Sequence, residues 1–166
     1  MQLMYQPSIT AAKSSIDLSS AYFVPDEMTI GVLTDALGRG VKIRIITPGE
    51  IIDTETVRAA SRGTWGPLLK EGAEIPEYQP SIYHCKVMIV DNLLVSVGST
   101  NFDNRSFRLN DEANLNVYDT DFARRQTAIF EEDLKNARQV TFQASTSCPW
   151  KEKLTERLAL QFGSQL

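Results

Sequence analysis

The sequence contains few of the side chains that bind transition metals. Its 166 residues include one histidine, His84, and two cysteines, Cys85 and Cys148. The cysteines lie far apart in the chain, whereas a zinc site needs a cluster of cysteine and histidine ligands at short spacings. We therefore expect no metal ion and no other cofactor, and we expect two free thiols, as in a reducing cytosol.

The sequence also lacks a long apolar run. No stretch approaches the roughly 18–20 apolar residues that cross a bilayer. The start of the chain, MQLMYQPSITAAK, has no basic segment followed by an apolar one, so it does not read as a signal peptide. We expect this chain to be soluble, and a longer parent protein could still carry a membrane anchor upstream.

An excess of basic residues is missing as well. The chain has 17 Lys+Arg against 21 Asp+Glu, a formal net charge of -4. Nucleic-acid binding relies on many lysine and arginine contacts to phosphate, so this balance argues against nucleic acid as a partner, although a local basic patch is compatible with it. The hydrophobic content of 42% and the chain length favour one globular domain with a sizeable core.

What the sequence does contain is an alternation of short apolar strands and amphipathic helices. Strands are expected at residues 14–24, 41–49, 84–90, 93–99 and 112–119, and helices at residues 1–15, 27–39, 54–70, 122–140 and 151–162. Asp26 and Asp121 are placed to cap helices, and YFVP at residues 22–25 is interpreted as a buried strand end. This order predicts an α/β fold of layered α/β/α type with a mixed β-sheet, and we expect residues 1–166 to form a single domain.

The most informative stretch is HCKVMIVD, residues 84–91. Residues two apart on a strand share a face, so we expect His84 and Lys86 to point to one side and Cys85 to point to the other, into the core. An imidazole can attack phosphorus or protonate a leaving oxygen, and an ammonium group can hold phosphate oxygens. This pair of side chains therefore suits phosphate chemistry.

Two carboxylates have different expected roles. Five residues of strand span roughly 16 Å, so Asp91 lies too far along the motif to touch the imidazole of His84, and we assign it to the turn that follows. A nucleophilic histidine is usually oriented by a carboxylate on its far ring nitrogen. Glu112 begins a strand that can lie beside the His84 strand, so Glu112 is the expected partner of His84.

The block GSTNFDNRSFRLNDE, residues 98–112, adds expected phosphate ligands. Gly98 lets the backbone approach a ligand, and Ser99 and Asn101 can donate hydrogen bonds to phosphate oxygens. Taken alone, each signal is weak: a chain of this length shows H-x-K-x4-D by chance roughly once in fifty. Arg105 and Arg108 alone would be solvated surface charges. Together, however, these weak signals occur in one order at one spacing, and this combination favours the functional interpretation.

In this order, the residues resemble the phospholipase D superfamily. HCKVMIVD matches its H-x-K-x4-D signature, and the downstream block resembles the N-x-D-x-R-S-F-x-x-N-x-E string of bacterial cardiolipin synthases. The positions of that string here are Asn101, Asp103, Arg105, Ser106, Phe107, Asn110 and Glu112. AYFVPDE and LLKEGAEIPEYQP also resemble the second half of such enzymes. The resemblance covers nearly the whole chain and implies the layered phospholipase D fold.

The resemblance implies a phosphodiester transfer that needs no metal. In the family, two H-x-K-x4-D halves face each other across one site; one histidine forms a phosphohistidine, and the other protonates the leaving alcohol. The implied catalytic set is His84, Lys86, Asp91 and Glu112, the phosphate ligands are Ser99 and Asn101, and the supporting residues are Gly98, Asp103, Arg105, Ser106 and Asn110. The substrate would be a phospholipid such as phosphatidylglycerol, which is converted to cardiolipin, or to phosphatidic acid when water is the acceptor.

The chain departs from the family because it carries one motif where the site needs two. Either two copies pair as a homodimer, or the chain is the C-terminal half of a two-motif enzyme. Its abrupt start and its second-half resemblance favour the half, in which His84 would be the general acid/base. The full-length protein would then associate with the bacterial cytoplasmic membrane.

Two other functions stay open. A homodimeric single-motif phosphodiesterase or nuclease would use the same residues, but the net charge of -4 speaks against it. A non-catalytic binding domain would keep the fold, but nothing in such a domain needs His84, Lys86, Asn101 and Glu112 together.

Overall fold

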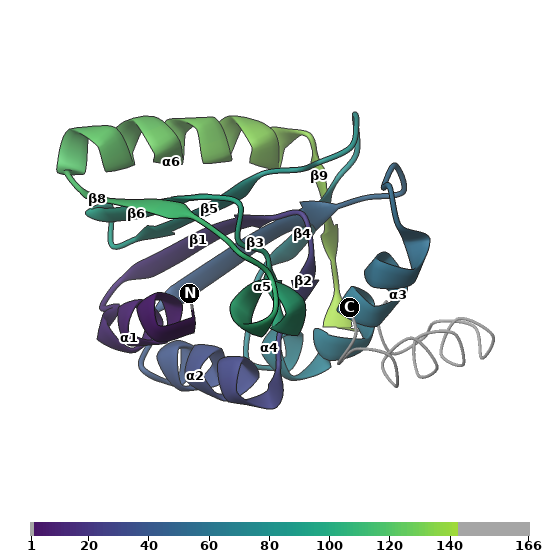
Figure 1. The fold of residues 1–166 in the computed structure, drawn as a ribbon, viewed down its shortest axis with the longest axis horizontal. Helices are drawn as coiled ribbons and strands as arrows, with labels where there is room; N and C mark the ends of the chain where they lie inside the picture. Colours follow the sequence, from purple (N-terminus) through teal and green to yellow (C-terminus); the bar gives the residue numbers. More distant parts are fainter. Residues whose placement is uncertain (1, 143–166) are drawn as a thin grey trace.

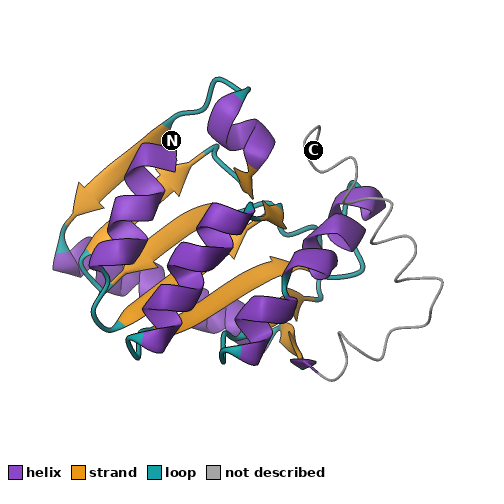
Figure 2. Cartoon of the chain, turned by 90° about the horizontal axis from the view of Figure 1, so that it is seen from below, coloured by secondary structure: helices purple, strands orange, loops and turns teal. Residues whose placement is uncertain are grey.

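The computed structural model describes residues 2–142, which form a central β-sheet with helices on both faces (Figures 1 and 2). The sheet has seven strands in the order β8-β6-β5-β1-β3-β4-β9. These strands are β1 (Ser15–Ser20), β3 (Lys42–Pro48), β4 (Ile75–Tyr78), β5 (Lys86–Val90), β6 (Leu94–Gly98), β8 (Asn114–Tyr118) and β9 (Ala137–Val140). A small second sheet joins β2 (Phe23–Val24) to β7 (Phe102–Asp103).

The helices divide between the two faces of the large sheet. They are α1 (Gln2–Ala11), α2 (Glu27–Gly38), α3 (Glu55–Thr64), α4 (Gly66–Lys70), α5 (Asn104–Arg108) and α6 (Thr120–Lys135). α6 runs along one face, and α1, α2 and α4 lie against the other (Figure 1). Within the sheet, β1 pairs in parallel with β3 and antiparallel with β5. The predicted layered α/β/α fold with a mixed sheet is confirmed.

Alternation along the central strands sends apolar side chains into two cores. Met88 and Val90 of β5 belong to the larger cluster, which includes residues of α1 and α2. Val87 and Ile89, on the opposite face of the same strand, pack with residues of α6. Fully burying one side chain of this size contributes about 1.5–3 kcal/mol, so both faces help to hold β5 in the middle of the fold.

Helix boundaries follow local polar signals, with one prediction confirmed and one wrong. Asp26 caps α2 by accepting a hydrogen bond of 2.8 Å from the backbone nitrogen of Thr29, as predicted. For α6 the cap is Asp119, which accepts a 2.7 Å bond from the nitrogen of Phe122. The predicted cap, Asp121, instead lies in the first turn of the helix, where its charge suits the helix dipole.

Three predicted elements are divided differently in the structure. The predicted strand at residues 14–24 is split into β1 and β2, and the predicted helix at residues 54–70 is split into α3 and α4. The second break lies just before Pro67, which has no backbone N–H with which to continue the α3 hydrogen bonds. The predicted helix at residues 122–140 ends at Lys135, because the residues of β9 pair with β4 instead.

The predicted helix at residues 151–162 and Cys148 lie outside the described residues.

The carboxyl ends of the parallel strands lie together along one side of the sheet, which is called the sheet edge below. β1, β3 and β4 run in the same direction, and β5 starts where β1 ends, because Ser20 lies opposite Lys86. β6 ends at this edge as well, since Val97 lies opposite Val87. Ligands of open α/β sheets bind outside the carboxyl ends of such strands, so the motif starts at the edge where a site is expected.

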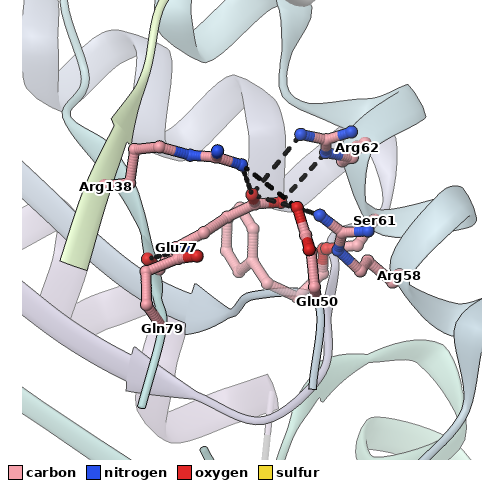
Figure 3. Close-up of polar contacts among 8 residues, drawn as sticks. Glu50, Arg58, Ser61, Arg62, Glu77, Gln79 and Arg138 are labelled. Carbon is pink, nitrogen blue, oxygen red and sulfur yellow. Dashed lines mark hydrogen bonds and ion pairs between the residues drawn. The ribbon is translucent and has the colours of Figure 1, made fainter. Parts of the chain in front are cut away.

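A buried ion cluster fixes α3 against the same part of the sheet. Glu77 of β4 is 0% exposed, and it accepts hydrogen bonds from Arg62 Nε at 2.9 Å and from Arg58 Nη2 at 3.2 Å. Arg138 of β9 lies 3.7 Å away on the other side (Figure 3). Because a buried carboxylate is tolerated only when it is paired and hydrogen-bonded, this cluster ties α3 and β9 to β4.

Candidate active site

The histidine and the lysine of the motif lie in contact. His84 is exposed in the segment that leads into β5, and Lys86, half-buried, is the first residue of that strand. The Lys86 Nζ lies 3.1 Å from His84 Nδ1 and 3.3 Å from Nε2. An unprotonated ring nitrogen can accept a hydrogen bond from the ammonium group. The pair therefore places a proton-transfer group, His84, beside a cation that can bind the same phosphate, Lys86.

Lys86 stands among acidic groups from separate segments of the chain. Burial lowers the pKa of Lys86 below its ordinary value, while nearby negative charges, among them those of Glu112, Asp53 and Asp103, act in the opposite direction. As a result, the protonated form of Lys86 is less stable here than it would be in water. A bound phosphate would favour that charged form, because it supplies an opposite charge at close range.

Two residues at this site were missed by the sequence reasoning. The Tyr22 ring meets the His84 ring edge-on, with the centroids 6.3 Å apart and the planes at 89°. The Tyr22 hydroxyl donates a 2.6 Å hydrogen bond to Asp53 Oδ2 in the loop before α3. Burial and this bond both raise the pKa of Tyr22. Its place just after β1 was an available signal for Tyr22, whereas no motif marks Asp53.

The predicted core position of Cys85 is wrong. Strand alternation predicted that it would pack in the core, but its side chain is exposed. The reason is that residues 84 and 85 precede β5, so the two-residue alternation of the strand begins only at Lys86.

Asp91 lies at the far end of β5 from His84 and holds the chain there. Its carboxylate accepts hydrogen bonds from the backbone nitrogens of Lys13, Ser14 and Ser15, at 2.9, 2.8 and 3.0 Å. Partial burial would raise the pKa of Asp91, but these bonds outweigh it and lower the pKa overall. The geometry fits the expected role of Asp91 in supporting the turn.

Glu112 lies just before β8 and is held by polar side chains. Its Oε1 accepts hydrogen bonds from Ser106 Oγ at 2.9 Å and Asn110 Nδ2 at 3.3 Å. Burial alone would raise the pKa of Glu112, yet hydrogen-bonding side chains, Ser99 first among them, and the charge of Lys86 lower it. The expected strand arrangement is wrong, because β6 lies between β8 and β5. Among residues 2–142, no hydrogen bond joins Glu112 to His84.

Gly98 and Ser99 bring β6 close to the segment before β8. A Cβ atom at Gly98 would lie 2.1 Å from the carbonyl oxygen of Ala113, a distance that no side chain tolerates. The Ser99 hydroxyl accepts a 3.1 Å hydrogen bond from the nitrogen of Ala113. Gly98 therefore allows the backbone of β6 to lie close to the backbone of the segment before β8.

The remaining residues of the downstream block gather around one cavity of about 320 Å³. Asn101, Asp103 and Ser106 are 8%, 4% and 2% exposed and line it together with Arg105 and Asn110. Asp103 caps α5 by accepting a 2.7 Å hydrogen bond from the nitrogen of Ser106. Burial raises the pKa of Asp103. The structure thus brings these predicted residues together beside the motif.

Residues 2–142 contain neither a candidate metal-binding cluster nor a candidate membrane-spanning helix. In that part of the chain, no three His, Cys, Asp or Glu side chains lie close enough together to hold a metal ion. No helix there has the length and apolar composition needed to cross a membrane.

The sequence matches known proteins over most of its length. The family model described as "Cardiolipin synthase, PLD-like domain" matches residues 5–134. A cardiolipin synthase of Geobacillus sp. (strain WCH70) is 38% identical over 156 residues, which cover 94% of this chain and 31% of the relative. Cardiolipin synthase 2 of Bacillus anthracis is 38% identical over 137 residues, which cover 82% of this chain and 26% of the relative. The chain spans less than a third of the length of these relatives.

Solved structures share the fold. Nuc of Salmonella typhimurium, a phospholipase D family member, superposes with a TM-score of 0.74 at 23% identity, over 84% of this chain and 90% of Nuc. The phosphatidylserine synthase of Haemophilus influenzae superposes with a TM-score of 0.76 at 13% identity, over 95% of this chain and 41% of the synthase. With His84 and Lys86 at the carboxyl ends of the parallel strands and its match to the family model, this chain belongs to the PLD-like domain family of cardiolipin synthases, within the phospholipase D superfamily.

Proposed function

We propose that this chain supplies one half of the active site of a cardiolipin synthase-type phosphatidyltransferase. The contact of Lys86 Nζ with His84 Nδ1 at 3.1 Å carries the proposal, because it joins a proton-transfer group to a cation that can hold a phosphate. Family membership supports the same chemistry. The donor is a phospholipid such as phosphatidylglycerol, and no metal takes part.

The reaction has two displacements at phosphorus. In the first, a histidine nitrogen forms a bond to the donor phosphorus while the bond to the glycerol oxygen breaks, and a second histidine protonates that oxygen. In the second, the hydroxyl oxygen of another phosphatidylglycerol attacks the phosphohistidine, and its proton passes to the second histidine. The products are glycerol and cardiolipin. Water as the acceptor gives phosphatidic acid.

The described residues take distinct parts in this scheme. His84 is the general acid/base when the chain pairs with a half that carries the nucleophile. Lys86 holds the phosphate oxygens, assisted by Ser99 and Asn101. Glu112 keeps a negative charge near Lys86, which favours the ammonium form.

A second H-x-K-x4-D half completes the site. We favour the remainder of a longer protein as its source, because the chain spans only 31% of the Geobacillus relative. A second copy of this chain is the other source. In either arrangement the enzyme works at a membrane surface, where its lipid substrates lie.

A second candidate function is a homodimeric single-motif phosphodiesterase or nuclease. The observation in its favour is that this chain covers 90% of Nuc, a much larger share than it covers of the synthases. The formal net charge of -4 opposes it, because a nuclease channel attracts polyanions with basic residues. Metal-independent cleavage of DNA or RNA by the isolated chain would favour this function over lipid transfer.

The test is an assay of the purified protein that carries this chain on phosphatidylglycerol vesicles in the presence of a chelator. We expect cardiolipin and glycerol as products, and we expect His84→Ala to abolish both. Ser81→Ala, an exposed position in the same segment, serves as the control and should keep full activity. Full activity of His84→Ala would sink the proposal.

A further inference from the structure

The 320 Å³ cavity adjoins the motif but is not lined by His84 or Lys86. Its volume lies within the range of roughly 300–1,000 Å³ that is typical of small-molecule sites. Tyr22 belongs to its wall and also meets the His84 ring at 6.3 Å between centroids. A molecule in this cavity would therefore lie one side chain away from the catalytic histidine.

The walls of the cavity differ in chemistry. Its polar wall includes Asn101 and Asp103, both buried, and Val24 and Val57 form a buried apolar wall. Arg105, which is exposed, stands at the rim. The cavity thus combines hydrogen-bonding oxygens inside with a cation at its mouth.

The polar wall contains an unused acceptor. Asn101 is 8% exposed, and its Oδ1 has no hydrogen-bond partner within residues 2–142. A buried acceptor without a donor is costly, and a hydroxyl group of a ligand would satisfy it. An asparagine amide has donor and acceptor ends, so its NH2 group remains available to the reacting phosphate. Burial raises the pKa of Asp103 above its ordinary value.

The cation at the rim is also unused. Arg105 forms no ion pair within the described part of the chain, whereas Arg108 on the same helix lies 3.7 Å from Asp26. A guanidinium group matches the geometry of phosphate oxygens and binds them through two parallel hydrogen bonds. Arg105 is therefore suited to an anion that enters the cavity mouth.

We propose that this cavity binds the acceptor of the transfer reaction, with a polyol hydroxyl at Asn101 and Asp103 and the phosphate of the same molecule on Arg105. This inference rests on the proposed phosphatidyl transfer. The acceptor headgroup of phosphatidylglycerol has hydroxyls at one end of a three-carbon chain and a phosphate at the other, which is the combination that the cavity walls offer. One headgroup hydroxyl stays at Asn101 and Asp103. The oxygen of the other headgroup hydroxyl forms the new P–O bond while the P–N bond of the phosphohistidine breaks, and the proton of this second hydroxyl passes to the general base.

The first test is a binding titration of the 166-residue chain with glycerol phosphate, followed by amide NMR signals. We expect shifts at Asn101, Arg105 and Asn110, and about tenfold weaker binding to Arg105→Gln, since a hydrogen bond to a charged group is lost. Arg108→Gln removes the same charge from the same helix outside the cavity and should bind as the wild type does. Equal binding to both variants, or no binding to the wild type, would overturn the inference.

Inorganic phosphate and glycerol are the companion probes, because a site that recognises only the anion would also bind free phosphate. If the cavity recognises the whole acceptor, each probe binds about tenfold or more weakly than glycerol phosphate, since each lacks one of its two contacts. Inorganic phosphate that binds as tightly as glycerol phosphate would refute polyol recognition.

The second test is the product ratio of the active enzyme on phosphatidylglycerol. Arg105→Gln should lower cardiolipin relative to phosphatidic acid about tenfold, because water needs no anion site, while Arg108→Gln should leave the ratio unchanged. An enzyme with no turnover of any phosphodiester contradicts the proposed function. An active enzyme whose product ratio ignores Arg105 contradicts only the acceptor site.

Discussion

The hydroxyl of Tyr22 donates a 2.6 Å hydrogen bond to Asp53, and the ring of the same tyrosine meets His84 edge-on. One side chain thus joins the loop before α3 to the segment that carries the motif. It also forms part of the wall between the proposed general acid/base and the cavity. Tyr22 is best described as a positioning residue, since it acts on the reaction through His84.

Changing Tyr22 should therefore affect turnover more than substrate binding. Tyr22→Phe keeps the ring against His84 and should retain activity within a few-fold, while Tyr22→Ala should lower kcat by about tenfold, since an aromatic pair contributes roughly 0.5–1.5 kcal/mol. Steady-state kinetics on phosphatidylglycerol would measure both variants. A purely structural role would lower the melting temperature of Tyr22→Ala and leave kcat of the folded fraction unchanged.

The alkaline limit of activity should report the protonation of Lys86. Burial lowers its pKa from the ordinary value of 10.5, and the proposed role requires the charged form. Activity should therefore fall as pH rises through that lowered pKa. Lys86→Arg keeps a charge that does not titrate in this range, so its alkaline limit in kcat/KM should move to higher pH. An unchanged limit in this variant would assign the titration to another group.

Glu77→Ala should be among the most destabilising substitutions of the chain. It removes the buried carboxylate that Arg58 and Arg62 bind and leaves their charges unpaired. We expect a loss of roughly 3 kcal/mol, the lower end for a broken buried pair, because both arginines keep some access to water. Glu50→Ala, at a side chain 71% exposed, is the control and should change the free energy of unfolding by less than about 0.5 kcal/mol. Urea unfolding would measure both, and equal losses would contradict the assignment.

Gly98→Ala should separate the end of β6 from the segment before β8. The added methyl group would lie 2.1 Å from the oxygen of Ala113, so backbone must move, at a cost of about 1–3 kcal/mol. Because that segment leads from Glu112, catalytic activity should fall as well. Gly31→Ala is the matched control: its Cβ meets nothing within 4 Å in the middle of α2, and it should stabilise the protein by about 0.5–1 kcal/mol. A fully active and stable Gly98→Ala variant would contradict this account.

Local patterns predicted the fold where local forces decide it. The apolar alternation of β5 and the cap at Asp26 depend on neighbouring residues, and both appear in the structure. β9 was missed because residues 137–140 carry little apolar alternation and become a strand only through pairing with β4, which lies far away in sequence. The position of β8 beyond β6 is also a non-local choice, and for that reason the placement of Glu112 beside the His84 strand was wrong.

The candidate site divides in the same way. The order of His84, Lys86, Asn101 and Glu112 in the sequence was enough to select them. Tyr22 and Asp53 were not selected, because their contact forms between two loops that only the folded sheet brings together.

The position of β9 has a consequence for biosynthesis. The strand that borders β4 is contributed by residues 137–140, so a ribosome must translate nearly all of the described chain before this side of the sheet can close. Until then β4 presents an unpaired edge, and such edges are prone to association between nascent chains. Arg138, which approaches Glu77, arrives with the same strand. Completion of the domain during synthesis is thus tied to its last described strand.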